Sequence, residues 1–275
     1  MMMKTPLRYP GGKSRATKKI AQFLPDLTKY KSYHEPFLGG GSVALYIAQT
    51  YPHLDIWVND LYTPLIEFWQ TLASKGDELY NELIQLKYRH CEPGSAKQLF
   101  LEAKEYLDRE TSTIFDRSVS FYIVNKCSFS GLTESSSFSP QASDNNFTVR
   151  GIEKLKYYRS IIETWKITNT TYEELYTDSV GTFTYLDPPY EIRSSLYGKR
   201  GRMHKGFDHD KFYENCDHSC GHMMVSYNSS QLIKDRFVDW DAQEYDHTYT
   251  MRSVGDYMKD QQDRKELLLL NYGIR

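Results

Sequence analysis

The pattern of hydrophobic and polar positions along the chain predicts a mixed α/β fold. Short runs rich in β-branched, aromatic or leucine residues predict five strands, near 32–37, 55–59, 182–187, 222–227 and 266–272. Segments with helical spacing lie at 12–24, 42–50, 61–74, 77–89, 96–109, 113–126, 151–165, 208–219 and 229–236. Because helices separate most of the strands, the pattern indicates a mainly parallel sheet.

The spacing of the strands is uneven and predicts an inserted lobe. The stretch between the strand at 55–59 and the one at 182–187 is mostly helical, with a Ser/Asn-rich loop at 128–146. This stretch is too long for a single crossover between parallel strands. We therefore expect a catalytic domain of 1–60 and 166–275 and an inserted lobe at 61–165. The loop is of a type that can stay disordered until a partner binds.

Charge is distributed unevenly, although the 275 residues carry a formal net charge of only −2. Eight basic residues between 4 and 31 face one acid, Asp26, and a second basic run occupies 193–205. These runs either form solvated faces or contact phosphates locally. The chain has four cysteines and no stretch typical of a signal peptide or a membrane span, which favours a reduced, cytoplasmic protein.

A glycine-rich turn in "HEPFLGGGSVAL" (34–45) connects a predicted strand to a predicted helix. Glycines at such a turn let a ligand approach the backbone, although a tight turn without ligand explains them too. Asp60, at the end of "IWVND", can accept both hydroxyls of a ribose or can cap the next helix. Together the turn and the acid indicate a nucleoside ligand without a pyrophosphate.

Two other segments resemble ligand sites. "RYPGGKSR" (8–15) contains Gly-Lys-Ser, but the phosphate-loop pattern needs a glycine at position 7, which is leucine. Lys13 is instead expected to reach a carboxylate or a nearby phosphate. "CDHSCGH" (216–222) contains possible zinc ligands, but alternating residues on one short stretch seldom converge on a metal. We expect no metal site.

The segment "TYLDPPYE" (184–191) has the strongest chemical signature in the chain. Asp187 ends a buried strand, where ligands of α/β sheets bind. Pro188 and Pro189 hold the chain extended, so that Asp187 and the Pro188 carbonyl could accept hydrogen bonds from one exocyclic amino group. Tyr190 would stack on the ring that carries this group.

Taken together and in this order, the motifs resemble those of the Dam-like group of DNA adenine-N6 methyltransferases. The resemblance implies a Rossmann-like catalytic domain with S-adenosylmethionine as cofactor, and Asp187, Pro188, Pro189 and Tyr190 as catalytic residues. The implied cofactor contacts are Tyr9, Lys13, Glu35, Pro36, Phe37, Gly39, Gly41, Ser42, Asp60, Tyr172 and Asp187. "VSYN" (225–228) and "RSV…ELLLLNY" (252–272) resemble the closing strands of the group.

The resemblance also implies contacts with double-stranded DNA. The inserted lobe would recognise the target, and the basic run after the catalytic motif would contact phosphates. The implied DNA-binding residues are Asn125, Lys126, Ser130, Gly131, Arg193, Lys199 and Arg200. Thr133 stands where relatives that recognise GATC tend to carry the arginine that contacts guanine, so the recognition sequence stays open.

The expected reaction is transfer of a methyl group from S-adenosylmethionine to adenine N6 of a base that has left the duplex. Three alternatives remain open: methylation of RNA adenine, methylation of cytosine N4, and a catalytically idle DNA-binding subunit. No obligate protein partner is expected.

Overall fold

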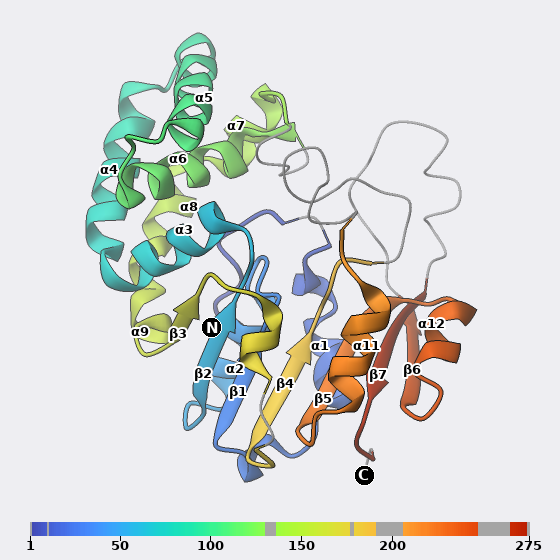
Figure 1. The fold of residues 1–275 in the computed structure, drawn as a ribbon. Coiled ribbons are helices and arrows are strands. Elements are labelled where there is room, and N and C mark those ends of the chain that lie inside the picture. The colour runs from blue at the N-terminus through green and yellow to red at the C-terminus, as the bar shows by residue number, and fades with distance from the viewer. Residues whose placement is uncertain are drawn as a thin grey trace.

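The central sheet of the protein has seven strands in the order β3-β2-β1-β4-β5-β7-β6 (Figure 1). The computed structural model describes residues 2–9, 11–129, 136–176, 179–190, 206–246 and 265–273. The strands are β1 (Ser32–Glu35), β2 (Asp55–Asn59), β3 (Lys166–Thr168), β4 (Thr182–Leu186), β5 (His222–Asn228), β6 (Asp241–Asp246) and β7 (Lys265–Leu270). From β3 to β5 the neighbouring strands pair in parallel, whereas β7 runs antiparallel to β5 and β6. The predicted fold class, a Rossmann-like α/β sheet, is confirmed.

The inner strands are buried on both faces because their residues alternate between two hydrophobic cores. In β7, Leu268 and Leu270 join the larger core, while Leu267 and Leu269 join the smaller one. The larger core continues into helices α2 (Ser42–Thr50) and α3 (Thr63–Ser74), and the smaller one lies against α11 (His209–Asp217) and α12 (Gln231–Arg236). The sheet is therefore covered by helices on both faces, which explains the nearly continuous apolar runs in its inner strands.

The segment predicted as an inserted lobe, 61–165, consists mostly of helices packed beside the strand ends (Figure 1). Its helices are α3, α4 (Gly76–Arg89), α5 (Pro93–Asp108), α6 (Ile114–Cys127), α7 (Pro140–Asn146), α8 (Val149–Glu153), η5 (Lys154–Tyr157) and α9 (Arg159–Ile162). The start of α6 is fixed by a capping box, in which Thr113 and Asp116 bond to each other's backbone N–H groups. Helix α3 packs against both α6 and β3, and lobe residues such as Phe121 share one core with Tyr33 of the sheet. The division at residue 61 therefore stays a prediction.

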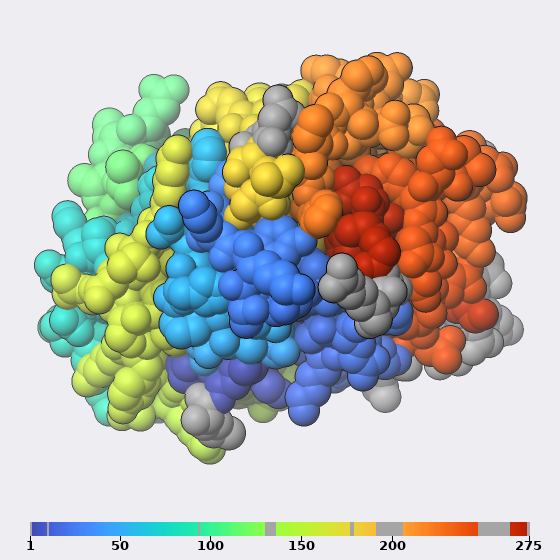
Figure 2. Space-filling model, turned by 90° about the horizontal axis from the view of Figure 1, so that it is seen from below, coloured from blue at the N-terminus to red at the C-terminus, as the bar shows by residue number. Residues whose placement is uncertain are grey.

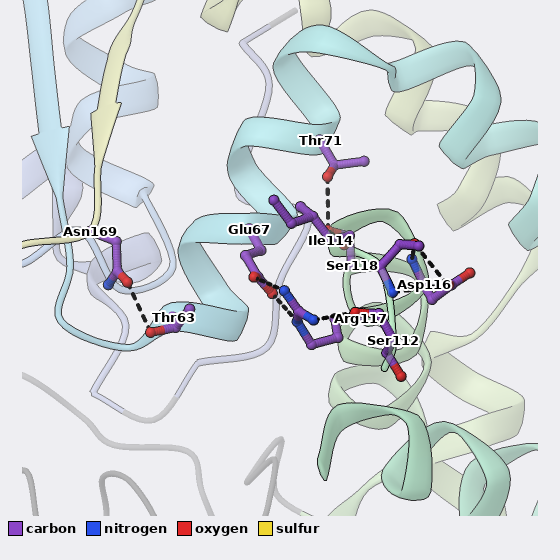
Figure 3. Close-up of polar contacts among 10 residues, drawn as sticks. Thr63, Glu67, Thr71, Ser112, Ile114, Asp116, Arg117, Ser118 and Asn169 are labelled. Carbon is purple, nitrogen blue, oxygen red and sulfur yellow. Dashed lines mark hydrogen bonds and ion pairs between the residues drawn. The ribbon is translucent and has the colours of Figure 1, made fainter. Parts of the chain in front are cut away.

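A buried polar junction joins α3 to α6 (Figure 3). Arg117 donates to both carboxylate oxygens of Glu67, through Nε at 2.8 Å and through Nη2, and its Nη1 donates to the Ser112 carbonyl. The hydroxyls of Thr71 and Ser118 lie 2.8 Å apart in the same interface. These contacts hold α3 and α6 together.

The remaining short helices lie near the amino terminus and before β4. They are η1 (Lys13–Arg15), α1 (Thr17–Ile20), η2 (Ala21–Phe23), η3 (Leu27–Lys29) and η6 (Tyr172–Leu175). Figure 2 shows segments from both ends of the chain, coloured blue and red, side by side on one face. Here the Tyr272 hydroxyl donates to the Phe23 carbonyl at 2.9 Å. This contact ties the end of the described chain to the segment that carries Lys13.

The structure corrects several element predictions. All five predicted strands are present, but the edge strands β3 and β6 were missed. Strand β3 has three residues and β6 is mostly exposed, so neither has the buried run that marks a strand in sequence. The single helices predicted at 12–24 and 151–165 are each broken into α and 3-10 turns, and α7 lies within the predicted loop 128–146. Proline at the start of α7 and the Ser139 cap fix that helix locally.

Candidate active site

The candidate site lies where the parallel strands end. Since β1, β2 and β4 run parallel and in register, their carboxyl ends meet at one edge of the sheet. The residues that follow these ends are Pro36 after β1, Asp60 after β2 and Asp187 after β4. Three segments far apart in sequence thus bring the predicted motifs to one edge.

The glycine turn after β1 has the backbone that its glycines predict. Gly39 and Gly41 have φ angles of 49° and 67°, which side chains disfavour. A Cβ on Gly41 would lie 2.8 Å from the Trp69 ring, and one on Gly39 would lie 3.0 Å from the Tyr9 ring. The glycines are therefore required by these two aromatic rings, independently of any ligand.

Asp60 organises the same turn from the end of β2. Its carboxylate accepts hydrogen bonds from the backbone N–H groups of Gly39 (2.8 Å) and Tyr62 (3.0 Å). Burial raises the pKa of Asp60 to about 6, and these backbone donors oppose the rise. A carboxylate has about four acceptor positions, so Asp60 could still accept the hydroxyls of a ribose. The two readings of this acid, local cap and ligand acceptor, are compatible.

Lys13 forms the centre of the site. Its Nζ donates to both oxygens of Asp187, at 2.8 and 2.9 Å, and to the Gly11 carbonyl at 3.2 Å. Burial would lower the pKa of Lys13, but Asp187 and Glu266 outweigh this and raise it well above its ordinary value. Lys13 therefore stays protonated, and its charge opposes the burial that raises the pKa of Asp187.

The segment that carries Lys13 connects Asp187 to the glycine turn. The Tyr9 ring packs on Gly39, and the Ser14 and Ser42 hydroxyls lie 2.8 Å apart at the start of α2. One short segment therefore touches both Asp187 and the glycine turn, and the carboxylate that Lys13 reaches is that of Asp187.

Aromatic rings line the neighbouring part of the sheet edge. Phe37 stacks on Tyr172 with ring centroids 5.4 Å apart, and Phe207 and Phe212 pack against both. Tyr172 and Phe37 are both half-buried, so they offer apolar surface beside Asp60. Glu35, by contrast, is buried beneath the turn and accepts a hydrogen bond from the Tyr33 hydroxyl at 2.5 Å.

Two residues at this site were missed by the sequence analysis, Glu266 and Trp69. The Tyr190 hydroxyl donates to Glu266 Oε2 at 2.5 Å, and the same oxygen lies 4.0 Å from Lys13 Nζ. Lys13 Nζ also lies 4.9 Å from the centre of the Tyr190 ring. The available signal was the acid in "KELLLL", which interrupts an otherwise apolar strand.

Two lobe residues predicted to touch DNA, Asn125 and Lys126, lie at a junction with the N-terminal segment. Asn125 is fully buried; its side chain accepts from the Arg8 N–H at 2.9 Å and donates to the Arg8 carbonyl at 2.6 Å. The Arg8 guanidinium donates to the carbonyls of Ser128 and Lys126. Burial, reinforced by the charge of Arg8, lowers the pKa of Lys126 to about 8. Asn125 thus joins the lobe to the N-terminal segment, and a DNA contact would require it to leave Arg8.

Five predicted DNA-binding residues lie outside the described residues. They are Ser130, Gly131, Arg193, Lys199 and Arg200.

The side chains of "CDHSCGH" turn to separate partners. Cys216 is buried beside the Tyr176 hydroxyl, His218 bonds the Glu214 carbonyl, and His222 bonds the Tyr30 hydroxyl. Within the described ranges, no group of three or more His, Cys, Asp or Glu side chains is arranged to hold a metal ion.

The fold and the site together define the class of the protein. A mostly parallel α/β sheet carries a glycine turn after β1, an acid after β2 and Asp-Pro-Pro-Tyr after β4, which is the arrangement of a Rossmann-like methyltransferase. Residues 9–251 match the family of D12 class N6 adenine-specific DNA methyltransferases, and the chain belongs to that family. It is therefore an enzyme that methylates adenine N6 in DNA, as the motifs predicted.

Curated relatives agree with this membership. The chain is 25% identical to the type II methyltransferase M.MjaIII of Methanocaldococcus jannaschii, over 99% of this chain and all of the relative. It is 23% identical to the type II methyltransferase M1.LlaDCHI of Lactococcus lactis subsp. cremoris, over 97% of this chain and 94% of the relative. A DNA N-6-adenine-methyltransferase of Escherichia phage P1 is 26% identical over 46% of this chain and 15% of its own length. Among the described residues, no helix is long and apolar enough to cross a membrane.

Proposed function

We propose that the chain methylates a flipped adenine of duplex DNA with S-adenosylmethionine, at a site built from Lys13, Asp187 and Tyr190. The observation that carries this proposal is the double hydrogen bond from Lys13 to Asp187 beside the glycine turn. This bond supports the proposal because it holds Asp187, a hydrogen-bond acceptor, at the strand end next to residues suited to a nucleoside.

The residues near the turn fit S-adenosylmethionine. Asp60 retains acceptor positions for ribose hydroxyls, and Phe37 and Tyr172 offer apolar ring surface for an adenine. The start of α2 at Ser42 supplies backbone N–H groups that favour a carboxylate. Tyr9, Pro36 and Glu35 lie next to this turn and would help to hold its backbone in place. When bound, the cofactor supplies an electrophilic methyl group.

The catalytic residues act on the amino group of the target base. This group is paired within a duplex, so the adenine must first leave the stack. Asp187 and the Pro188 carbonyl then accept the two N–H bonds, which aims the lone pair of N6 away from them and toward the donor. Pro189 keeps the segment extended, and the Tyr190 ring stacks on the base. Correct positioning supplies most of the rate.

Recognition of DNA is assigned to the lobe at 61–165 and to the basic run after Tyr190. Arg193, Lys199 and Arg200 would bind phosphates, and Ser130 and Gly131 would lie near the bases. Asn125 and Lys126 would serve at the junction with Arg8, through which DNA contacts of the lobe could reach the cofactor segment. We place the enzyme in the cytoplasm, because its four cysteines are free.

The experiment that tests this function replaces Asp187, the proposed acceptor for the adenine amino group. Asp187→Ala should lower methyl transfer at least about 1,000-fold while cofactor affinity changes less than about threefold, because Asp187 acts on the base. Asp239→Ala, an exposed acid, is the control. Mass analysis of digested DNA and RNA, after expression in a host that lacks adenine methylation, identifies the methylated base. Normal turnover of Asp187→Ala, or product on RNA or cytosine, would contradict the proposal, and duplex binding without methylation would indicate an idle subunit.

A further inference from the structure

Glu266 is a buried carboxylate in a strand of leucines. It is 1% exposed and begins the buried part of β7, where Leu267–Leu270 fill the next four positions. A carboxylate removed from water costs several kcal/mol unless charges and hydrogen bonds compensate it. A fifth leucine would pack there without this cost, so the partners of Glu266 decide what it does.

Those partners belong to the candidate active site. The Tyr190 hydroxyl donates to Glu266 Oε2 at 2.5 Å, and Lys13 Nζ lies 4.0 Å from the same oxygen. Lys13 in turn donates to both oxygens of Asp187. Two carboxylates therefore share one ammonium group, and the second of them also holds the ring expected to stack on the base.

The direction of β7 explains how a C-terminal residue reaches this site. Because β7 is antiparallel to β5, its first residues lie at the carboxyl ends of the parallel strands. Glu266 is paired with Asn228, the last residue of β5, and β5 lies next to β4. The start of β7 is thus the place in this strand from which a side chain can meet Tyr190.

Exposure separates the role of Glu266 from that of Asp187. The Asp187 side chain is 21% exposed, whereas those of Lys13 and Glu266 are 4% and 1% exposed. Asp187 is therefore accessible to a substrate, whereas Glu266 is shielded from solvent.

We propose that Glu266 is a positioning residue for methyl transfer, which fixes the Tyr190 ring through its hydroxyl and holds Lys13 against Asp187. This inference rests on the proposed function of the site. Glu266 touches neither base nor cofactor; it sets the base-holding groups in place before DNA binds. Its loss should therefore lower kcat with little effect on KM.

Three substitutions separate the parts of this role. Glu266→Leu removes charge and acceptor while matching the strand, Glu266→Gln keeps an acceptor for Tyr190, and Tyr190→Phe removes only the hydroxyl. We expect kcat to fall about 100-fold for Glu266→Leu and about 10-fold for each of the other two, since small displacements at a reacting centre are costly. KM for DNA and for cofactor should stay within about threefold of the wild type. Tyr190→Phe combined with Glu266→Leu should be no slower than Glu266→Leu alone, because both act through one contact.

The control is Glu244→Gln, an acid on the neighbouring strand β6 that pairs with the surface lysines Lys234 and Lys265. It should leave kcat unchanged. Rates are referred to the folded fraction, measured by circular dichroism. A normal kcat for folded Glu266→Leu, or additive losses in the double variant, would overturn the inference. If Asp187→Ala is inactive while Glu266→Leu is normal, this inference alone fails; if both are active, the proposed function fails.

Discussion

Two sets of ion pairs in this molecule differ in how their charges balance. In the lobe junction, Arg117 meets Glu67 with two donors on two oxygens, and one cation balances one anion (Figure 3). At the strand ends, Lys13 serves both Asp187 and Glu266, so the carboxylates outnumber the cation. The lobe pair joins two helices of the same region, whereas the site cluster joins three segments from both ends and the middle of the chain.

Under the proposed function, the lobe pair holds the fold and the site cluster acts on the substrate. A pair with balanced charges and complete hydrogen bonds has no donor or acceptor left for a ligand. Apolar residues of similar volume can often replace such a pair. The site cluster keeps Asp187 partly exposed, with acceptor positions left over. Such an arrangement costs stability and is kept where chemistry needs a charge.

Removing the cation of the site should separate the two sets of ion pairs most clearly. Lys13→Met leaves Asp187 and Glu266 close together without a counter-ion, which favours protonation of one of them and removes an acceptor for the adenine amino group. We expect kcat to fall about 100-fold. Steady-state kinetics with Lys18→Met, an exposed neighbour, as the control would test this. A Lys13→Met enzyme with normal kcat would show that the cluster is structural, like the lobe pair.

Breaking the lobe pair should instead change stability. Arg117→Met leaves Glu67 buried without its partner, so we expect the free energy of unfolding to fall by about 3 kcal/mol. Activity per folded molecule should persist. The control is Arg159→Met, whose exposed ion pairs with Asp77 and Glu163 should contribute less than about 1 kcal/mol.

A double substitution sharpens this result. Glu67→Met combined with Arg117→Met should recover most of the lost stability, because an apolar pair of similar volume replaces the balanced ion pair. Urea unfolding followed by circular dichroism measures all three variants. If the double variant were no more stable than Arg117→Met, the junction would depend on its charges after all.

The ends of the parallel strands could be predicted from the sequence, whereas the contacts between distant segments could not. The ends of β1, β2 and β4 were predictable because each buried run stops at an acid, a glycine or a proline. The contact between Lys13 and Asp187 was predicted only in part: Lys13 was expected to contact a carboxylate or a phosphate, without naming Asp187. The role of Glu266 was not predicted, because Glu266 lies in a strand of leucines. Glu266 reaches the site only because β7 is antiparallel to β5, and the direction of a strand cannot be predicted from its periodicity.

The lobe was less predictable than the sheet, for a physical reason. Asn125 was predicted to contact DNA, yet its amide bonds to the backbone of Arg8, a residue far away in sequence. The glycines of the turn were expected to admit a ligand, and the rings of Tyr9 and Trp69 also require them. Contacts of this kind arise from packing between distant segments, on which local patterns carry no information.

The last and smallest expected effect concerns Glu35, a buried carboxylate. Its hydrogen bonds come from two neutral groups, the Tyr33 hydroxyl and the Ala44 N–H. Burial raises the pKa of Glu35 to about 8. Between its ordinary pKa and pH 8, the folded protein therefore binds a proton that the unfolded chain lacks, and stability falls as pH rises. Glu35→Gln should remove up to about 1.4 kcal/mol per pH unit from this slope in urea unfolding between pH 5 and 8. Glu244→Gln should leave it unchanged, because the pKa of Glu244 is lowered to about 2 by its hydrogen bonds to Lys234 and Ser229. An identical slope in Glu35→Gln and wild type would show that Glu35 is ionised in the folded protein, and that neutral donors alone can sustain a buried charge.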